Sequence, residues 1–353
     1  MNSSLVFVGM SGGVDSSVSA MLLKEQGYKV VGVYMKNWSK DLPGMKCPWA
    51  EDLADAKRVA VKLGIDFEVW DFEGEYHKKV VEYMLDEFKK GNTPNPDIMC
   101  NQEIKFKLFY EKAMERGADF IATGHYARII DGKLARAVDE NKDQTYFLYR
   151  ISEEALSHTI FPIGEVTKPE VKKLAEKNGL HNAYKKESMG VCFVGEVGMK
   201  DFLKEYIDIK PGEIREIESE KVLGYHEGAV FYTIGQRHGL YLSGVVGEIN
   251  DGMPYYVVKK DLAKNIVYVS KNLNNENIWT RELALKDVLL RTDTVAKCLE
   301  QTILVRLRHR APLISAKFDG KKITFDSEIK RPASGQSAVL YDGEICLGGG
   351  IIV

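Results

Sequence analysis

Apolar positions near the N-terminus follow two different spacings. Residues 5–10 (LVFVGM) and 29–35 (KVVGVYM) are short apolar runs of the kind found in buried strands. Between them, the apolar positions of residues 14–22 recur at helical spacing, and this run ends at Gly27. The pattern predicts a strand, a helix and a second strand in one βαβ unit.

The same alternation continues to about residue 205. EDLADAKRVAVKLG predicts a helix that ends at Gly64, and DFEVWDF predicts the strand that follows it. Two further helices are predicted in YHKKVVEYMLDEFKKG and KFKLFYEKAMERG, and another strand in DFIATGH. Strands that alternate with helices predict an α/β domain whose parallel sheet carries helices on both faces.

Beyond about residue 205 the apolar runs become short and are separated by turn signals, as in HEGAVFYTIG, GMPYYVVKKD and NIVYVSKN. A second block of this kind extends from about Leu283 to Val353, where DGK and DGE indicate hairpin turns. Both blocks predict all-β structure. We expect boundaries near residues 205 and 275, which give domains at 1–205, 206–275 and 276–353.

Composition agrees with an ordinary globular protein. Of 353 residues, 44% are apolar and 28% are charged, which is enough apolar mass for more than one core. The formal charge of −2 means that local patches would have to bind any polyanion. The N-terminus has no basic, apolar leader, and no stretch reaches the roughly 18 apolar residues of a membrane span, so we expect a cytosolic protein.

The cysteines are scattered along the chain and none forms a CxxC pair, so neither a disulfide framework nor a zinc ribbon is indicated. Free thiols in a reducing compartment are expected. Cys298 and Cys346 lie in β-like apolar runs, and we expect them to be small buried residues. Cys47, in GMKCPWAED, could line a pocket or stand at the start of a helix.

The motif SGGVDSS, residues 11–17, stands between the first predicted strand and the first predicted helix. Its two glycines let backbone N–H groups approach an anion at a helix N-terminus, so phosphate is the expected ligand. Ser11, Ser16 and Ser17 add hydroxyl donors, and Asp15 can orient backbone amides or bind a magnesium ion attached to the phosphates. The motif is neither a Walker loop nor a dinucleotide fingerprint, and a simple Gly-rich turn is the alternative.

Two cysteines stand where a thiolate would be favoured. Asp97 precedes Cys100 in NTPNPDIMCNQEIKF, where a Pro-rich loop leads into a helix whose dipole would stabilise the thiolate. An ionised Asp97 would oppose that effect, so we expect it to transfer a proton to or from a substrate. Cys192 follows Lys185 and Lys186 in KKESMGVCFVGE, where small neighbours leave its sulfur accessible. For either cysteine, an inert buried position is the alternative.

SGGVDSS resembles the loop of the N-type ATP pyrophosphatases, which grips the β and γ phosphates of ATP while a substrate oxygen attacks the α phosphorus. Over essentially the whole chain, the sequence is similar to the tRNA-specific 2-thiouridylases of the bacterial and mitochondrial type. The motifs that carry this resemblance are GMSGGVDSS, TPNPDIMCNQEIKF, ATGHYARI, KDQTYFLY, FPIGEVTKPEVKKLA, ESMGVCFVG, VFYTIGQRHGL and RPASGQSAVLYDGEICLGGG. RPASGQ departs from the family pattern because Ser334 stands where a proline is usual.

The resemblance implies a Rossmann-like parallel-sheet ATP-pyrophosphatase domain, a small β-rich central domain and a C-terminal β-barrel that contacts tRNA. It implies that ATP with Mg²⁺ adenylates the 2-oxo group of the wobble uridine. A persulfide on Cys192, charged by a cysteine desulfurase or sulfur-relay protein, would then attack the activated carbon. Cys100 would release 2-thiouridine and leave a Cys100–Cys192 disulfide, with Asp97 as proton shuttle.

The resemblance also implies which residues bind ATP and tRNA. ATP is expected to contact Gly9, Met10, Ser11, Gly12, Gly13, Val14, Asp15, Ser16, Met35 and Gly124. The target base is expected at Asn95, Pro96 and Asp97, and the tRNA body at His125, Lys142, Asp143, Gln144, Arg308, His309 and Gln336. Arg306, Arg308 and Arg310 alternate, so we expect them on one face of a strand, where they would contact RNA phosphates. A solvated charged face is the alternative.

Three other functions are compatible with parts of this pattern. A synthetase that adenylates a small molecule would use the same loop but would not need Cys100 and Cys192. A tRNA-binding protein whose nucleotide loop no longer turns over is a second possibility. A third is that Asp97, Cys100 and Cys192 ligate an iron–sulfur cluster instead of cycling through a disulfide.

Overall fold

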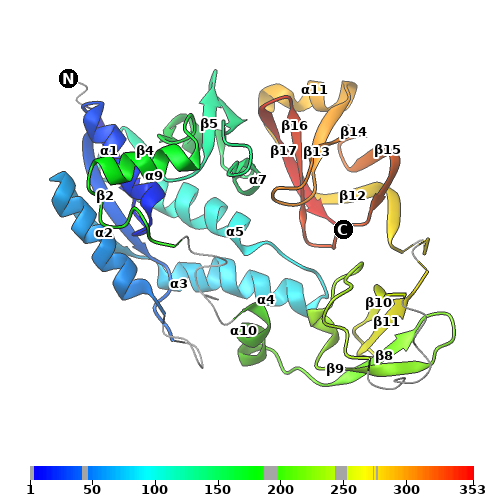
Figure 1. Ribbon diagram of the computed structural model, residues 1–353. Coiled ribbons are helices and arrows are strands. Elements are labelled where there is room, and N and C mark those ends of the chain that lie inside the picture. Colours follow the sequence, from blue (N-terminus) through cyan, green and yellow to red (C-terminus); the bar gives the residue numbers. More distant parts are fainter. Residues whose placement is uncertain (1–3, 42–46, 187–197, 243–252, 273, 276) are drawn as a thin grey trace.

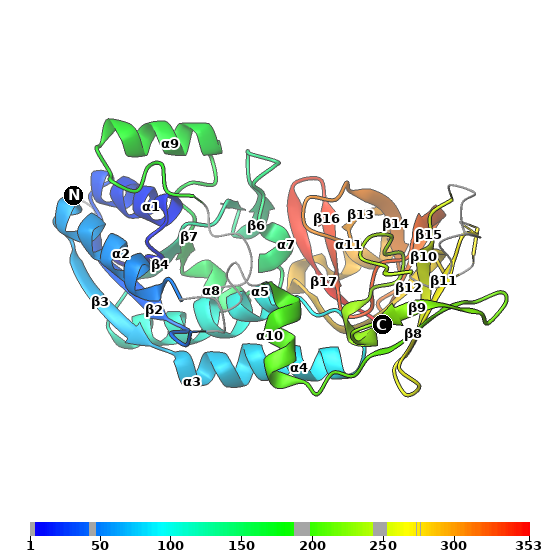
Figure 2. The same ribbon diagram turned by 60° about the horizontal axis from the view of Figure 1, so that its bottom comes forward.

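The computed structural model describes residues 4–41, 47–186, 198–242, 253–272, 274–275 and 277–353. These residues form three sheets in three regions of the molecule (Figure 1). The N-terminal domain holds a parallel sheet, and the C-terminal barrel and a small central sheet lie beside it at the opposite end of the molecule from the N-terminus (Figure 2). Among the described residues, no helix is long and apolar enough to cross a membrane.

The N-terminal sheet has five strands in the order β3-β2-β1-β4-β7, and every pair is parallel. Its strands are β1 (Leu5–Gly9), β2 (Lys29–Lys36), β3 (Asp66–Asp71), β4 (Phe120–Thr123) and β7 (Thr159–Ile160). Because successive side chains of a strand point to opposite faces, Val6 and Val8 of β1 pack on one side and Phe7 on the other. The parallel sheet predicted from the sequence is confirmed.

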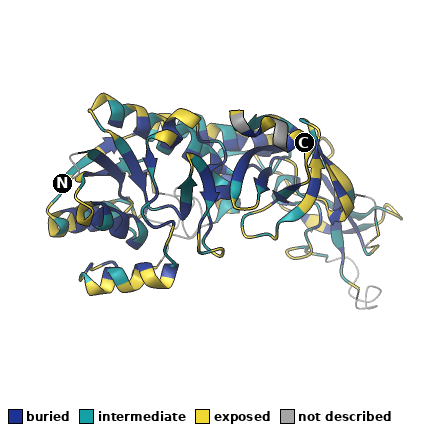
Figure 3. Cartoon of the chain, turned by 90° about the horizontal axis from the view of Figure 1, so that it is seen from above, coloured by how far each residue is buried: buried dark blue, intermediate teal, exposed yellow. Residues whose placement is uncertain are grey.

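Helices cover both faces of this sheet. On the face of Val6 and Val8 lie α1 (Val14–Glu25), α2 (Trp49–Leu63) and α9 (Lys168–Lys177). On the face of Phe7 lies α3 (Glu73–Tyr76), which continues through the π-helical turn η1 (His77–Val81) into α4 (Glu82–Lys89). The same face is covered by α5 (Pro96–Met99), the π-helical η2 (Cys100–Leu108) and α6 (Phe109–Glu115). Buried residues gather on the strands, and the helices carry exposed residues on their outer faces (Figure 3).

The central domain follows α10 (Met199–Tyr206) and contains one four-stranded sheet in the order β10-β11-β8-β9. The strands are β8 (Gly212–Glu216), β9 (Val222–His226), β10 (Tyr256–Asp261) and β11 (Ile266–Ser270), with the short 3-10 turn η3 (Ala229–Phe231) after β9. Ile214, Val257 and Val267 lie in its own apolar core. The β-rich texture that begins near residue 205 therefore corresponds to a real sheet.

The C-terminal domain is an antiparallel barrel of six strands that closes through the pairing of β12 with β17. The strands are β12 (Trp279–Leu290), β13 (Ile303–Arg306), β14 (Ile314–Phe318), β15 (Lys322–Lys330), β16 (Ser337–Asp342) and β17 (Ile345–Ile352). A hairpin of the N-terminal domain, β5 (Ala127–Ile130) and β6 (Lys133–Arg136), extends its sheet through the pairing of Ala135 with Ile345. This shared sheet joins the first domain to the last.

The C-terminal block is β-rich as expected, with one helical connection that was not predicted: η4 (Thr292–Thr294) and α11 (Val295–Glu300) connect β12 to β13, and the buried Cys298 belongs to that helix. One expectation about this block is wrong. The alternating arginines do not share a strand face, because β13 ends at Arg306 and Arg310 has a φ of +62° in the turn that follows. Cys346, in β17, is fully buried as expected.

Candidate functional site

The SGGVDSS segment, residues 11–17, joins β1 to α1, and we call it the phosphate loop after its expected ligand. Gly12 has a φ of +77°, and a Cβ atom there would lie 2.3 Å from the backbone oxygen of Asp52, so only glycine fits this position. The hydroxyls of Ser16 and Ser17 both donate to the carbonyl of Gly13, at 3.1 and 2.9 Å. These bonds hold the turn against the first turn of α1, whose N-terminus carries the positive end of the helix dipole. The loop has the shape that an anion site needs.

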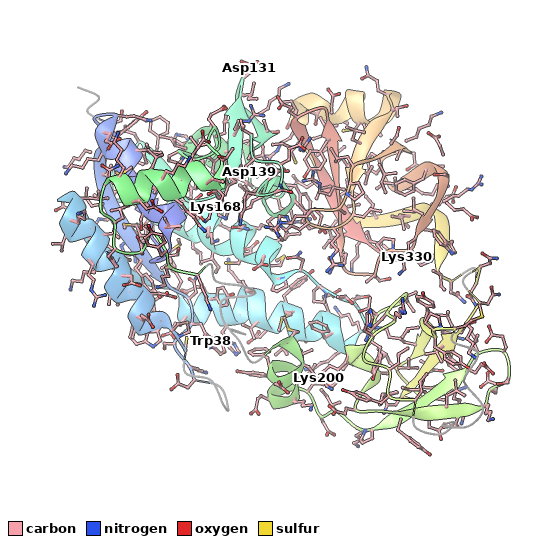
Figure 4. The ribbon with its side chains drawn as sticks, viewed as in Figure 1. Trp38, Asp131, Asp139, Lys168, Lys200 and Lys330 are labelled. Carbon is pink, nitrogen blue, oxygen red and sulfur yellow. The ribbon has the colours of Figure 1, made fainter. Side chains whose placement is uncertain are left out.

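Asp15, in the first turn of α1, is bound to two residues from distant parts of the chain. The ammonium of Lys168 donates to both of its carboxylate oxygens, at 2.7 and 2.8 Å, and the hydroxyl of Tyr126 donates to one at 2.9 Å. Lys168 is 6% exposed and stands at the start of α9, beside Asp139 (Figure 4). The sequence motif FPIGEVTKPEVKKLA contains this lysine, but only the fold places it at the loop.

Asn182 is a second residue that sequence reasoning missed. Its side-chain amide donates to the carbonyl of Gly12 and to the hydroxyl of Ser17, both at 2.9 Å, and the residue is 2% exposed. Lys185, three residues further along, forms ion pairs with Asp52 and Asp55 of α2 at 2.7 and 2.6 Å. The segment after α9 therefore holds the phosphate loop through Asn182 and α2 through Lys185.

Met35 and Gly124 meet the loop at the carboxyl ends of neighbouring strands. A Cβ atom on Gly9 would lie 2.8 Å from Cε of Met35, and one on Gly124 would lie 2.6 Å from the backbone nitrogen of Ser16. The two glycines thus permit the close packing of β1, β2 and β4 around the loop. The carboxyl edge of a parallel sheet is where such folds bind their ligands.

Asn95, Pro96, Asp97 and Cys100 lie together at the start of one helical segment. The side chain of Asn95 caps α5 by accepting from the backbone N–H groups of Asp97 and Ile98, at 3.1 and 3.3 Å, and Pro96 occupies the first helical turn. Cys100 begins η2 and is 4% exposed. Burial raises the pKa of the Asp97 carboxyl above its usual range, and the nearby Lys105 ammonium opposes that rise. A carboxyl whose pKa is raised in this way holds a proton more readily than an exposed aspartate does.

His125 lies between the phosphate loop and the Asp97 segment. Its Nδ1 is 2.8 Å from the hydroxyl of Thr123, and its Nε2 is 3.4 Å from the ammonium of Lys105. Burial and the charge of Lys105 hold the pKa of His125 well below its usual value, so the ring is neutral at pH 7. Through β4 and Lys105 the two halves of the expected site therefore adjoin one another.

Cys192 lies outside the described residues, so its pairing with Cys100 and its place in an iron–sulfur site stay predictions. Among the residues that the structure describes, no group of His, Cys, Asp and Glu side chains could hold a metal ion. Cys47 is buried, with its sulfur 3.7 Å from the carbonyl of Trp38, and burial raises the pKa of its thiol. The raised pKa disfavours the thiolate of Cys47, which favours a structural role for this residue.

The KDQ residues lie at the joint between the N-terminal domain and the barrel. Asp143 is 1% exposed, and its carboxylate accepts from Arg306 at 2.6 Å and from the hydroxyl of Thr145 at 2.9 Å. Gln144 accepts from the backbone N–H of Tyr126 at 2.9 Å. Lys142 is half-buried beside them. The expected direct contact of the Asp143 side chain with RNA does not fit, because the fold encloses that carboxylate and supplies its partners.

Arg308 is exposed in the turn after β13, and His309 packs against Phe147 with ring centroids 4.6 Å apart. Burial and the charge of Arg310 lower the pKa of His309 to about 4, so this ring is neutral at pH 7. Gln336 does not lie with them, because its side-chain amide donates to the carbonyl of Thr93 at 2.7 Å. The residues expected to contact the tRNA body therefore divide between an exposed turn, two domain joints and, for the buried His125, the interior of the N-terminal domain.

Three family models match consecutive parts of the chain. They are described as a tRNA methyl transferase HUP domain (residues 4–196), a tRNA methyl transferase PRC-barrel domain (200–271) and an aminomethyltransferase beta-barrel domain (281–352). The curated proteins named tRNA-specific 2-thiouridylase MnmA include one from Listeria monocytogenes, 46% identical over 98% of this chain and 94% of its own. Another, from Exiguobacterium sibiricum, is 46% identical over 98% of this chain and 93% of its own.

Likeness to solved structures is more distant. A 4-thiouridine synthetase in complex with RNA and ATP covers 57% of this chain and 50% of its own at 18% identity, with a TM-score of 0.38. The relatives at 46% identity, by contrast, match from one end of the chain to the other. On the strength of these full-length matches, the chain belongs to the tRNA-specific 2-thiouridylase family.

Proposed function

We propose that this protein is a tRNA 2-thiouridylase that uses ATP to replace the 2-oxygen of the wobble uridine with sulfur. The observation that carries this proposal is the convergence at the end of β4. There Gly124 packs on the backbone of Ser16 in the phosphate loop, while His125 contacts Lys105 near Asp97. One short segment thus brings an ATP-type loop within reach of the Asp97–Cys100 helix.

The chemistry needs both halves of this site. The uridine 2-oxygen attacks the α phosphorus of ATP and pyrophosphate leaves, which makes the oxygen a good leaving group as AMP. The terminal sulfur of a Cys192 persulfide then bonds to C2 and AMP departs. Cys100 attacks the Cys192 sulfur, so that 2-thiouridine leaves and a disulfide forms, which a thiol reductant resets. The raised pKa of Asp97 suits a group that takes up and returns the proton of the base.

The phosphate loop supplies the groups that ATP would contact. Backbone N–H groups of Gly12 and Gly13 and the dipole of α1 would face the phosphates. Lys168, held by Asp15, would add positive charge where pyrophosphate forms. Magnesium would accompany the phosphates of ATP, but the Asp15 carboxylate is already bound by Lys168 and Tyr126 and does not fit as an open magnesium ligand. We assign no step to the ion.

The three matched domains divide the work. Residues 1–205 would adenylate and thiolate the base, residues 206–275 would link the other two, and residues 276–353 would contact tRNA. Arg308 is the exposed cation best placed to contact a phosphate, and neutral His309 with Phe147 offers a surface on which an unstacked base can stack. A persulfide-bearing protein would supply the sulfur, and the reaction would take place in the cytoplasm, where its tRNA substrate is found.

The proposal is tested by incubating the protein with unmodified tRNA, ATP, magnesium and a persulfide-generating desulfurase, and measuring 2-thiouridine in the digested RNA by mass spectrometry. We expect an ATP-dependent product that Cys100→Ser and Cys192→Ser both abolish. Cys298→Ser is the control, because that thiol lies in the apolar core of the barrel, and it should keep the activity. Release of AMP and pyrophosphate without 2-thiouridine in the wild type would refute thiolation.

A synthetase acting on a small molecule is the nearest rival. It would use the same phosphate loop, but it would have no need of Cys100, Cys192 or a barrel joined to the catalytic domain. Methyl transfer, which the descriptions of two family models mention, would require neither a loop that binds the phosphates of ATP nor a cysteine that carries a persulfide. The relatives named as thiouridylases match 98% of the chain.

A further inference from the structure

Residues 91–95, GNTPN, join α4 to α5 and are contacted from all three domains. The end of α4 lies where the central sheet and the barrel approach the N-terminal domain (Figure 1). The segment stands directly ahead of Asp97 and Cys100 in the chain. Whatever fixes its backbone also fixes the start of the helix that carries both residues.

The central domain holds the first residue of this segment. Gly91 follows the C-terminal end of α4 with a φ of +84°, and its carbonyl accepts from the ammonium of Lys260 in β10 at 2.9 Å. A Cβ atom on Gly91 would lie 2.6 Å from the side chain of Leu262, which packs directly on it. A cation is well placed here, because the C-terminus of a helix carries the negative end of its dipole.

The barrel holds the middle of the segment with two hydrogen bonds to one residue. The backbone N–H of Thr93 donates to the carbonyl of Ser334 at 2.7 Å, and the side chain of Gln336 donates to the carbonyl of Thr93 at 2.7 Å. Between them, Gly335 has a φ of +90°, and a Cβ atom there would lie 2.9 Å from Cβ of Asn92. The barrel therefore presses on this segment as closely as its backbone allows.

The buried Glu87 in α4 adds a third connection. It accepts from the side chain of Asn92 at 2.7 Å, from Lys90 at 2.8 Å and from Lys286 of β12 at 3.5 Å. Burial would raise the pKa of Glu87, but these partners outweigh it and lower the pKa, so the carboxylate stays charged. At the far end of the segment, Asn95 caps α5 through the N–H groups of Asp97 and Ile98.

We propose that Lys260 and Gln336 are positioning residues that act through residues 91–95 to place Asp97 and Cys100. The helix reaches its working position when the central domain and the barrel are both seated on the segment. This inference rests on the proposed function for its kinetic consequence, while its structural consequence is independent of any activity.

Lys260 is a suitable residue for separating positioning from mere stability. Burial lowers the pKa of its ammonium to about 8, which means that the fold holds the charged form against a desolvation cost. Replacing it with methionine keeps the apolar stem and removes that cost, so the domain should stay folded while the bond to Gly91 is lost. Lys259, the exposed neighbour on the same strand, provides the matched control.

The first measurement is hydrogen–deuterium exchange of the protein without RNA or ATP. In Lys260→Met and Gln336→Leu, the amides of Thr93, Asp97 and Ile98 should exchange about tenfold faster than in the wild type, because local opening becomes easier. Lys259→Met should exchange like the wild type. Unchanged exchange in both Lys260→Met and Gln336→Leu would overturn the proposal, whether or not thiolation is observed.

The second measurement is steady-state 2-thiouridine formation. We expect kcat to fall about tenfold in Lys260→Met and Gln336→Leu, because a displaced proton shuttle and thiol slow the chemical step. The KM for tRNA should stay within about twofold, and Lys260→Arg, which keeps the donor, should restore kcat. A rise in KM with unchanged kcat would overturn the proposal and would make Gln336 a direct RNA contact.

Discussion

Replacement of Asp143 by alanine should destabilise the joint between the N-terminal domain and the barrel. Arg306 and Asp143 are 2.6 Å apart, and their side chains are 6% and 0% exposed. Removing one partner of a buried ion pair leaves an uncompensated charge and costs roughly 3–5 kcal/mol. Because neither side chain is exposed, solvent screening does not reduce this figure. Asp143→Ala also removes the acceptor of the Thr145 hydroxyl.

For a chain of 353 residues that unfolds as one unit, a loss of that size should lower the temperature of the thermal transition by about 4–7 °C, which differential scanning calorimetry would detect. The double variant Asp143→Ala with Arg306→Met should recover much of the loss, because it leaves no buried charge without a partner. Glu140→Ala is the control: its pair with Arg136 is exposed at the carboxylate, and it should change the transition little.

The result that would refute this reasoning is specific. If Asp143→Ala unfolds within about 2 °C of the wild type but binds tRNA more weakly, the carboxylate acts on the RNA and is not the anchor of the joint. If the double variant is less stable than Asp143→Ala alone, the uncompensated charge is not the cause of the loss.

Three further predictions concern ATP and tRNA. Lys168→Met should slow tRNA-dependent release of pyrophosphate by roughly 100-fold, because it removes the cation beside the phosphate loop, while Lys172→Met on the exposed face of α9 should not. Arg308→Ala should make the slope of log K for tRNA binding against log salt concentration shallower by about one, the change expected for one lost phosphate contact. An unchanged slope would exclude that contact. The pKa of His309 is lowered to about 4 in the folded protein from the usual 6.5. Between pH 4 and pH 6.5 the unfolded protein therefore binds a proton at His309 that the folded protein does not, so the free energy of unfolding falls as the pH drops from 6.5 to 4. His309→Gln should lose less stability than the wild type over that range in thermal melts, and an equal loss would contradict the assigned pKa.

Local sequence patterns were sufficient for the elements and for the phosphate loop. Gly12 and Gly64 both adopt positive φ where turn signals were expected, and the helices and strands around them follow from apolar spacing. Helix α11 was not predicted because it is only six residues long and lies inside a β-rich block, where a short apolar run does not distinguish helix from strand. The C-terminal arginines misled because alternation of charge in VRLRHR says nothing about where β13 ends.

Contacts between distant segments could not be predicted from local patterns. Lys168 and Asn182 lie 153 and 170 residues from the partners they bind in the phosphate loop, and no spacing rule links positions that far apart. The same is true of Arg306 and Asp143, and of Gln336 and Thr93. Each of these pairs forms only in the folded protein. The motifs can be recognised one by one in the sequence, but the contact between them cannot be predicted from it.

These long-range pairs change the interpretation of the motifs they belong to. KDQ and RPASGQ are each interpreted as RNA-contacting segments. In the structure, however, the side chains of Asp143 and Gln336 form hydrogen bonds between domains. Arg308 lies only two residues beyond Arg306, so an RNA phosphate bound there would sit beside the joint that Asp143 secures. A weakened affinity for tRNA in an Asp143 variant therefore identifies an RNA contact only when the thermal transition is unchanged. Measured together, affinity and stability separate a residue that binds RNA from one that holds the RNA-binding domain in place.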